Sequence, residues 1–326
     1  MPSIYTHYKF GTDVLNKLDN KTKNLINKKI DYYNLFNQSF DTLYYYNFLS
    51  LKKGKDIRDF AHYAHRNNTN SFFENLIIYI KNNNLENNSD IMNFLYGFLN
   101  HYALDTTIHP FLNYKTGRYN KLDKSTRKYK GLHTKVEIMI DRYIYEKNTK
   151  MNWYKYKIYK DFLKKIDFSN ELKNTIDYIF EKTYCKKNIG NILEISNKQS
   201  LTIYKVLMKD RYGIKKLGYH TIDICTPFKN SLYSSYSQHV PKVNKKLLNA
   251  DNLPWCNPVD KDMFYEKSFF NLYDEALNYS INLIKTANCV IKNEQNISEL
   301  LKLLGNKNYE TGLSIDDKRL LQYFEF

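Results

Sequence analysis

The chain has 326 residues, of which 42% are hydrophobic and 16% aromatic, including 31 Tyr and 19 Phe. This composition provides material for a large core and excludes a predominantly disordered chain. With only 10 Gly and 6 Pro, the sequence favours long regular elements with few tight turns, so we expect an all-α fold. The formal net charge of +16 favours phosphate-bearing partners such as nucleic acid or anionic lipid. The basic residues are spread along the whole chain, however, so the charge alone identifies no partner.

The cysteines and the N-terminal residues indicate the cellular compartment in which we expect the protein. The four cysteines form no C-x-x-C pair, which is typical of free thiols in a reducing environment. The first residues lack a basic region followed by an apolar run, and no apolar run approaches the ~18 residues of a membrane span. We therefore expect a soluble, cytoplasmic protein without a transmembrane segment. An extracellular location is the less favoured alternative.

The first quarter of the chain is expected to be helical and rich in aromatic side chains. Residues 12–29 show a broken helical stripe, and residues 56–81 have the periodicity of one long helix that carries two histidines. Between them, residues 31–51 are dense in aromatic side chains and contain Asp41. Because an unpaired buried charge is costly, Asp41 should be paired or metal-bound. A carboxylate at the surface or at a helix cap is the alternative.

The next stretch presents ligand-type side chains at a helical spacing. His101, Asp105 and His109 recur every four residues, which places them on one face of a helix expected from residue 91 to about residue 107. Pro110 follows directly and disfavours helical geometry in the residue before it. We therefore expect His109 at or just past the end of this helix.

A second array of such side chains follows a basic loop over residues 115–130. His133, Glu137 and Asp141 repeat the four-residue spacing on another expected helix. Two helices that each present imidazole and carboxylate groups can converge on metal from two sides, and these ligands suit zinc without excluding manganese or iron. A lone histidine on an apolar face is more often a core or capping residue. Ligand-type residues in two matched arrays instead predict a metal site.

The second half of the chain gives coarser signals. Helices are expected over residues 155–182, 198–209 and 268–285, whereas residues 213–258 hold four of the six prolines and predict a long irregular segment over the helical body. No internal repeat, Gly-rich phosphate loop or heptad array is evident. We therefore expect a single domain over residues 1–326, with the motifs in residues 1–145 and a helical and irregular half in residues 146–326.

The N-terminal half resembles the zinc-dependent phospholipase C family of bacteria, whose fold is shared by the single-strand-specific zinc nucleases of fungi and plants. The matching pieces are Thr6-His7 up to Gly11, Asp41 before an aromatic run, Ala64-His65-Arg66, residues 97–110, and Gly131-Leu132-His133 up to Glu137. Asn257-Pro258 and the helix expected after them resemble the family's C-terminal segment less specifically.

The resemblance implies an all-helical fold with up to three zinc ions at the bottom of a cleft. One zinc would bind His65, His101 and Asp105, with Asp41 beside it, and a second would bind His109, His133 and Glu137. Asp105 would bridge to a third ion held by His7 and by the N-terminus, which is Pro2 if Met1 is removed and Met1 otherwise.

Three choices among the histidines accompany this ligand set. His65 is preferred to His62 because the His65-Arg66 dipeptide is typical of the family. For His7, the alternative is simple packing among the neighbouring aromatic side chains. His220 and His239 match nothing in the family, so we expect them at the surface or in loops.

The resemblance also implies a hydrolase that acts on phosphoric esters. Adjacent zinc ions polarise phosphoryl oxygens and lower the pKa of a bound water toward ~7, so that zinc-bound hydroxide attacks phosphorus. Asp41 is placed to accept or orient the proton of that water, which is the role of a general base. We expect cleavage of a phosphodiester, with release of a lipid headgroup as its leading form.

Two other functions stay open from the sequence. A single-strand-specific nuclease or nucleotidase on the same fold needs aromatic platforms along a basic groove, which this composition suits equally. A non-catalytic zinc-binding protein would keep the cluster and close the cleft. The expected partners are therefore a phospholipid headgroup, a nucleic acid or a nucleotide, with peripheral membrane contact through exposed aromatic and lysine side chains. The sequence does not indicate the oligomeric state.

Overall fold

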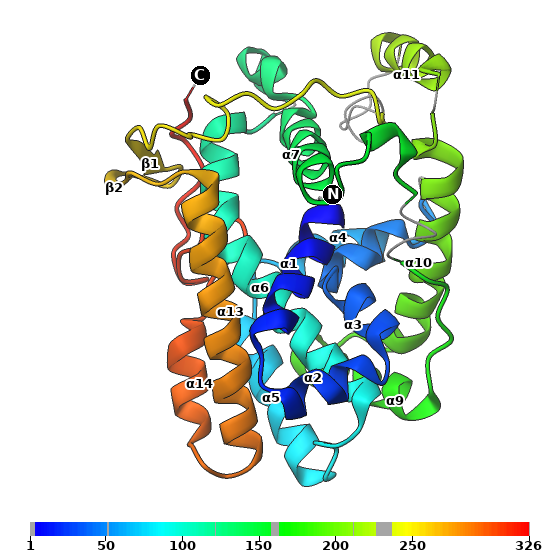
Figure 1. Ribbon diagram of the computed structural model, residues 1–326, viewed down its shortest axis with the longest axis vertical. Helices are drawn as coiled ribbons and strands as arrows, with labels where there is room; N and C mark the ends of the chain where they lie inside the picture. Colours follow the sequence, from blue (N-terminus) through cyan, green and yellow to red (C-terminus); the bar gives the residue numbers. More distant parts are fainter. Residues whose placement is uncertain are drawn as a thin grey trace.

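The computed structural model describes residues 4–50, 52–120, 122–157, 163–210, 212–225 and 237–325. Its helices surround one central helix, α6 (Ser89–Thr116), which is buried along nearly its whole length (Figure 1). A helix whose sides are apolar all round is typically enclosed by protein. The expected all-α class is confirmed, because the only sheet in the described part of the chain is a two-stranded hairpin.

The other elements follow in chain order. The N-terminal part contains α1 (Ile4–Lys17), α2 (Asn20–Asn27), α3 (Ile30–Phe36), the 3-10 helix η1 (Ser39–Tyr45), α4 (Lys55–Ala64) and α5 (Thr69–Asn82). After α6 come the 3-10 helix η2 (Lys124–Tyr129), α7 (Leu132–Thr149), the 3-10 turn η3 (Trp153–Lys155), α9 (Asn170–Tyr184) and α10 (Ile189–Ile203). The last part contains the π-helical turn η4 (Tyr204–Met208), α11 (Ile214–Cys225), the antiparallel strands β1 (Trp255–Asn257) and β2 (Asp260–Tyr265), α13 (Phe269–Ile291) and α14 (Ile297–Leu304).

Helices from both halves of the sequence pack against α6. α13 and α3 both lie along α6, while α1 and α7 pack against α6 and against each other (Figure 1). Apolar side chains from Phe10 to Tyr309 form one continuous core around these contacts. The position of α6 is therefore determined by helices that are far apart in the sequence.

A buried polar network fixes the rotation of α6. The side-chain amide of Asn100 donates to the Tyr33 hydroxyl at 2.7 Å and to Asn37 Oδ1 at 2.8 Å. Its oxygen accepts from the Ser280 hydroxyl at 2.6 Å. Because buried polar groups need such partners, these bonds tie α6 to α3 and α13. They also fix the direction of the next residue, His101.

The single long helix expected over residues 56–81 is wrong. The chain forms α4 and α5, separated by a turn in which Asn68 adopts a φ of 57°. Asparagine tolerates this left-handed conformation better than most residues, because its short polar side chain can bond locally. His65 consequently becomes the last, capping residue of α4 instead of a mid-helix residue.

The expected end of α6 near His109 is also wrong, because the helix continues past Pro110 to Thr116. The proline removes one hydrogen bond of the helix and costs ~3 kcal/mol in a helix interior. The following residues compensate: Phe111 and Leu112 are buried, and the Phe111 ring packs against Trp255 at a centroid distance of 5.3 Å. Burying side chains of this size stabilises by ~1.5–3 kcal/mol each.

The helices of the second half of the chain have other boundaries than expected. α9 begins at Asn170 and α10 at Ile189, instead of at residues 155 and 198, and residues 158–162 of the first expected helix lie outside the described part of the chain. The segment expected to be irregular over residues 213–258 contains α11 and β1, although its residues 226–236 lie outside the described part of the chain. The helix expected over residues 268–285 is confirmed and extends to Ile291. No described helix is both long enough and apolar enough to span a bilayer.

Candidate metal centre

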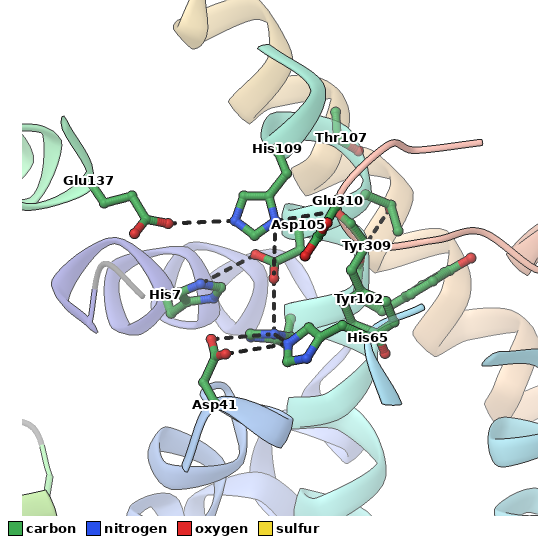
Figure 2. Close-up of polar contacts among 12 residues, drawn as sticks. His7, Asp41, His65, Tyr102, Asp105, Thr107, His109, Glu137, Tyr309 and Glu310 are labelled. Carbon is green, nitrogen blue, oxygen red and sulfur yellow. Dashed lines mark hydrogen bonds and ion pairs between the residues drawn. The ribbon is translucent and has the colours of Figure 1, made fainter. Parts of the chain in front are cut away.

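Asp105 lies at the centre of the candidate site (Figure 2). Its Oδ2 is 3.0 Å from His101 Nε2 and 3.7 Å from His109 Nδ1, because the four-residue spacing stacks the three side chains on one face of α6. The side chains of His101 and Asp105 are 0% and 3% exposed. A carboxylate buried this deeply needs a compensating positive charge.

The first group of ligand-type atoms combines three elements. His7 of α1, Asp41 of η1, and His101 and Asp105 of α6 each offer one atom, and these atoms all lie within 4.8 Å of one another. His7 Nε2 is 3.4 Å from Asp105 Oδ1, and Asp41 Oδ2 is 3.7 Å from His101 Nε2. The rings of His7 and His101 stack with centroids 4.5 Å apart.

His65 brings a further imidazole to the first group from the end of α4. Its Nε2 lies 3.3 Å from Asp41 Oδ1 and 3.4 Å from His101 Nε2. His62, one turn earlier, has its Nδ1 2.9 Å from the Tyr44 hydroxyl and belongs to neither group. Because α4 ends at His65, the His65 ring faces Asp41, whereas the His62 ring faces Tyr44.

The second group joins α6 to α7. Glu137 Oε1 lies 3.6 Å from His109 Nε2 and 3.3 Å from His133 Nε2. The two imidazole rings meet edge to face with centroids 5.5 Å apart. The His133 side chain is 30% exposed and that of His109 18%, so this group is the more open of the two.

Hydrogen bonds at Nδ1 show which ring nitrogen faces the carboxylates in four of the candidate histidines. The Nδ1 atoms of His65, His101 and His109 lie 2.7, 3.1 and 3.2 Å from the carbonyl oxygens of Ala61, Asn37 and Tyr309. His133 Nδ1 lies 3.3 Å from Thr116 Oγ1, whose own proton is donated to the Leu112 carbonyl. Because these oxygens act as acceptors, each Nδ1 carries a proton and each ring turns its Nε2 toward the carboxylates. This arrangement is typical of metal-binding histidines.

The distances within the groups fit a bound ion better than direct hydrogen bonds. Charge-assisted N–H···O bonds measure ~2.7–2.9 Å, whereas the imidazole–carboxylate distances here are 3.0–3.7 Å. The ligand atoms of tetrahedral zinc, at bond lengths of ~2.0–2.1 Å, are separated by about 3.3–3.4 Å. His65 Nε2 lies 3.3 Å from Asp41 Oδ1 and 3.4 Å from His101 Nε2, which matches that spacing. The residues present therefore fit zinc.

The charges of the cluster also favour a cation. Burial by itself raises the pKa of Asp105 and Glu137, but the neighbouring imidazoles outweigh burial and hold both pKa values well below their usual range. Burial lowers the pKa of His7 to about 4. At His109 the opposing effect of burial is outweighed by Asp105 and Glu137, which raise its pKa to about 9. Ionised carboxylates consequently line the site at neutral pH.

Two carboxylate oxygens and a small cavity mark where an ion could lie. Among the described residues, Asp105 Oδ2 and Glu137 Oε2 are buried without a hydrogen-bond partner. A cavity of about 20 Å³ lies between the groups and is lined by His7, Asp105, His109 and Glu137 together with apolar side chains. A space of this size holds roughly one water molecule. The two groups thus face a common space.

Asp141, the last residue of the second array, lies in neither group. Its carboxylate accepts hydrogen bonds from the backbone N–H groups of Tyr5 and Thr6, at 3.0 and 2.8 Å, and from the Thr6 hydroxyl at 2.7 Å. Burial raises the pKa of Asp141 to about 7, although these donors oppose the rise. The residue therefore anchors the first turn of α1, which carries His7.

Of the residues expected to bind a third ion, the structure describes His7 and Asp105. Oδ1 of Asp105 faces His7 and Oδ2 faces His101, so its two oxygens point to different imidazoles. Residues 1–3 lie outside the described part of the chain, so the N-terminal ligand, Pro2 or Met1, stays a prediction. His239, expected at the surface or in a loop, lies in a loop, and its Nε2 donates to the Asp210 carbonyl at 2.6 Å.

Sequence reasoning missed the carbonyl acceptors that orient the imidazoles. The carbonyls of Asn37 and Tyr309 lie 64 and 200 residues from the histidines that they bind. Every residue has a backbone carbonyl, so no residue type marks these positions. They become visible only once the chain has folded.

A helical fold with buried groups of imidazoles and carboxylates is typical of metal-binding proteins, and these candidate ligands suit zinc. The model of the zinc dependent phospholipase C family matches residues 6–186, more than half of the chain, and the chain belongs to this family. The matched residues include all eight candidate ligands and extend beyond residues 1–145. Together the family and the two groups support zinc as the metal and a phosphodiesterase-like activity. Comparisons with curated proteins and with solved structures gave no match.

Proposed function

We propose that this protein is a zinc-dependent phosphoric ester hydrolase of the phospholipase C type, which cleaves a phosphodiester. The observation that carries the proposal is that two imidazole–carboxylate groups lie next to one another, with His7 and Asp105 of the first group and His109 and Glu137 of the second lining one small cavity. Membership of a zinc-dependent phospholipase C family supports the same conclusion.

The proposed ligands divide between the two groups. His65, His101, Asp105 and Asp41 hold one zinc ion, and His109, His133 and Glu137 hold a second. His7, together with the N-terminal residue, holds a third ion next to Asp105. The protonated Nδ1 atoms support this assignment, because they leave every Nε2 of the four oriented imidazoles directed at a carboxylate.

The chemistry follows from these positions. Bound zinc would supply a Lewis acid that polarises phosphoryl oxygens and lowers the pKa of a water toward ~7. Asp41 directs both carboxylate oxygens into the first group, and we propose that it also accepts or orients the proton of the attacking water. The carbonyls of Ala61 and Asn37 hold His65 and His101 against rotation during the reaction.

The side of the site at His133 is the proposed route for substrate. Its partial exposure supports catalysis over a purely structural cluster, which would be closed on all sides. Lipid headgroup release is the leading form of the reaction because of the family. A nucleic acid or nucleotide carries the same phosphodiester chemistry and is the alternative substrate.

Three substrates separate these functions in one experiment. Zinc-loaded protein is incubated with phosphatidylcholine vesicles, a chromogenic phosphodiester and single-stranded DNA. We expect release of phosphocholine, loss of that release with a chelator, and its recovery when zinc is restored. Cleavage of DNA but not of phosphatidylcholine would identify a nuclease. No hydrolysis of any substrate by protein with bound zinc would contradict an enzymatic function.

Asp41→Asn tests the proposed base. The substitution keeps the volume and removes the charge, so we expect hydrolysis to fall by about 10²–10⁴-fold, the usual contribution of a positioned acid or base. Zinc at His109, His133 and Glu137 should remain. Asp59→Asn, on the exposed surface of α4, is the control and should hydrolyse as the native protein does. Unchanged turnover in Asp41→Asn would remove Asp41 from the mechanism.

A further inference from the structure

The chain after α14 returns across the metal site. The turn over residues 308–312 lies against α6, and Figure 2 shows its residues Tyr309 and Glu310 next to His109 and His65. This turn lies outside the residues matched by the family, which end at 186. The family match therefore gives no information on this turn.

Tyr309 contacts proposed ligands of both groups. Its N–H donates to the His65 carbonyl at 3.0 Å, and its own carbonyl accepts from His109 Nδ1 at 3.2 Å. The residue is 1% exposed, and its ring lies edge-on to the His65 ring at a centroid distance of 5.1 Å, with the His101 ring at 5.8 Å. Tyr309 therefore holds His65 in position and determines which nitrogen of His109 carries a proton.

Gly312 seats this turn on α6 at the proline. Its N–H donates to the Asn308 carbonyl at 2.9 Å, which closes the turn around Tyr309. A Cβ on Gly312 would lie 2.5 Å from the Thr106 carbonyl oxygen and 3.1 Å from Pro110 Cγ, and its φ is +66°. Pro110 has no N–H to bond that carbonyl within the helix. The turn therefore rests on the part of α6 where the helical ladder is interrupted, and only glycine fits there.

Glu310 holds the turn to two helices at once. Its carboxylate pairs with Arg66 at 2.5 Å, just after the end of α4, and its backbone carbonyl accepts from the Asn113 amide of α6 at 2.8 Å. Burial by itself raises the pKa of Glu310, but Arg66 outweighs it and lowers that pKa. The turn consequently joins the helix that carries His65 to the helix that carries His109.

We infer that the turn over residues 308–312 positions ligands of the metal site, and that Tyr309 is the positioning residue that orients His65 and His109 toward zinc. The inference rests on the proposed ligand set. Partners that orient metal-binding histidines typically contribute 10–100-fold to metal affinity. Displacing the turn should therefore weaken zinc binding by about that factor, beyond any effect on folding.

Gly312→Ala tests this inference against a matched glycine. Gly305 also has a positive φ, +70°, but the nearest atom to a Cβ there is a lysine side-chain carbon at 3.4 Å. Both variants carry the strain of a left-handed alanine, and only Gly312→Ala pushes the turn away from α6. We expect zinc affinity to fall about 10–100-fold in Gly312→Ala and to stay near the native value in Gly305→Ala. The absorption spectrum of bound cobalt(II) should change only in Gly312→Ala.

If Gly312→Ala does not fold, a second pair of variants tests whether the turn positions the zinc ligands. Glu310→Gln weakens the ion pair beside His65, whereas Glu325→Gln weakens the comparable pair with Lys115, 2.9 Å long, further along the same tail. We expect weaker zinc binding and an altered cobalt spectrum for Glu310→Gln alone. Equal zinc affinity and identical cobalt spectra in each variant and its control would overturn the inference. Native protein that binds no zinc would instead reject the ligand set of the proposed function.

Discussion

His101 has the most constrained position of the candidate ligands. Its side chain is 0% exposed, its Nδ1 faces the Asn37 carbonyl, and its Nε2 lies within 3.7 Å of Asp41, Asp105 and His65. Removing this ring opens a void between two carboxylates and leaves Asp105 without its closest imidazole. The effect should therefore reach both metal binding and stability.

We expect His101→Ala to lose at least one zinc ion per chain. Zinc at 100 times its dissociation constant stabilises a folded protein by about 2.7 kcal/mol, and the variant should lack that gain. Elemental analysis and urea unfolding with and without zinc measure the two effects. His62→Ala is the control, because His62 is near the site and belongs to neither group. Native zinc content in His101→Ala would exclude His101 as a ligand.

Asp141 gives a pH-dependent prediction. Its folded pKa of about 7 lies above the model-peptide value of ~3.9. Such a group stabilises the fold at pH below ~4, and its contribution is lost as pH rises to about 7. Asp141→Asn has no ionisable group at this position and lacks this pH-dependent contribution. The free energy of unfolding of the native protein should therefore fall relative to that of the variant as pH rises from ~4 to about 7. The difference between ~3.9 and about 7 corresponds to roughly 4 kcal/mol.

Urea unfolding of both proteins at several pH values, with a chelator present, measures this difference. Groups such as His7 titrate in the same range, but they occur in both proteins and cancel in the comparison. A stability difference that does not change between pH 4 and pH 7 would show that Asp141 is ionised throughout. Its three donors would then outweigh burial.

Five of the candidate ligands could be found from their spacing in the sequence, because helical geometry determines which residues share a face, whereas His7, Asp41 and His65 were assigned as ligands by the resemblance to the family. The four-residue spacings of α6 and α7 bring His101, Asp105 and His109 together and set Glu137 beside His133. The same rule failed for Asp141, which lies one turn beyond Glu137 and meets α1 instead. Spacing gives the face of a helix, but what that face meets depends on packing.

Among the elements, α6 illustrates both the strength and the limit of local signals. Its apolar pattern predicts a buried helix, yet Pro110 predicts an end that burial of Phe111 overrides. Between α4 and α5, the left-handed Asn68 breaks a pattern whose apolar periodicity runs on. The long-range packing that decides both cases cannot be read from a local window of the sequence.

The contact between α3 and α6 depends on Gly97. A Cβ there would lie 2.6 Å from the backbone carbon of Phe36, so the two helices must move apart to accommodate any other residue. We expect Gly97→Ala to destabilise the protein by about 1–3 kcal/mol, the usual effect of overpacking. Gly218→Ala in α11 is the control, because no atom lies within 4 Å of its Cβ position.

Urea unfolding measures both variants under the same conditions. Gly218→Ala should be neutral or stabilising by up to about 1 kcal/mol, because alanine is the better helix former. Because Gly97 precedes Asn100 and His101 by one turn, Gly97→Ala should also weaken zinc binding. Equal stability of the two variants would mean that α3 yields to the added methyl group without cost.

At the scale of the whole molecule, the metal centre joins parts of the chain that are far apart. The proposed ligands come from α1, η1, the end of α4, α6 and α7, and the turn at Tyr309 closes over them from the C-terminal side. The continuous core from Phe10 to Tyr309 supports our proposal that the chain forms one domain. Zinc bound at this junction would stabilise all of these elements together.

The central claim is that the two groups of imidazoles and carboxylates bind zinc. Native mass spectrometry of folded protein, purified without chelator and supplied with zinc, counts the bound ions and shows whether Met1 is present. We predict at least two zinc ions per chain, and a third if the N-terminal residue and His7 also bind one. A folded protein that carries one zinc ion or none would contradict this account.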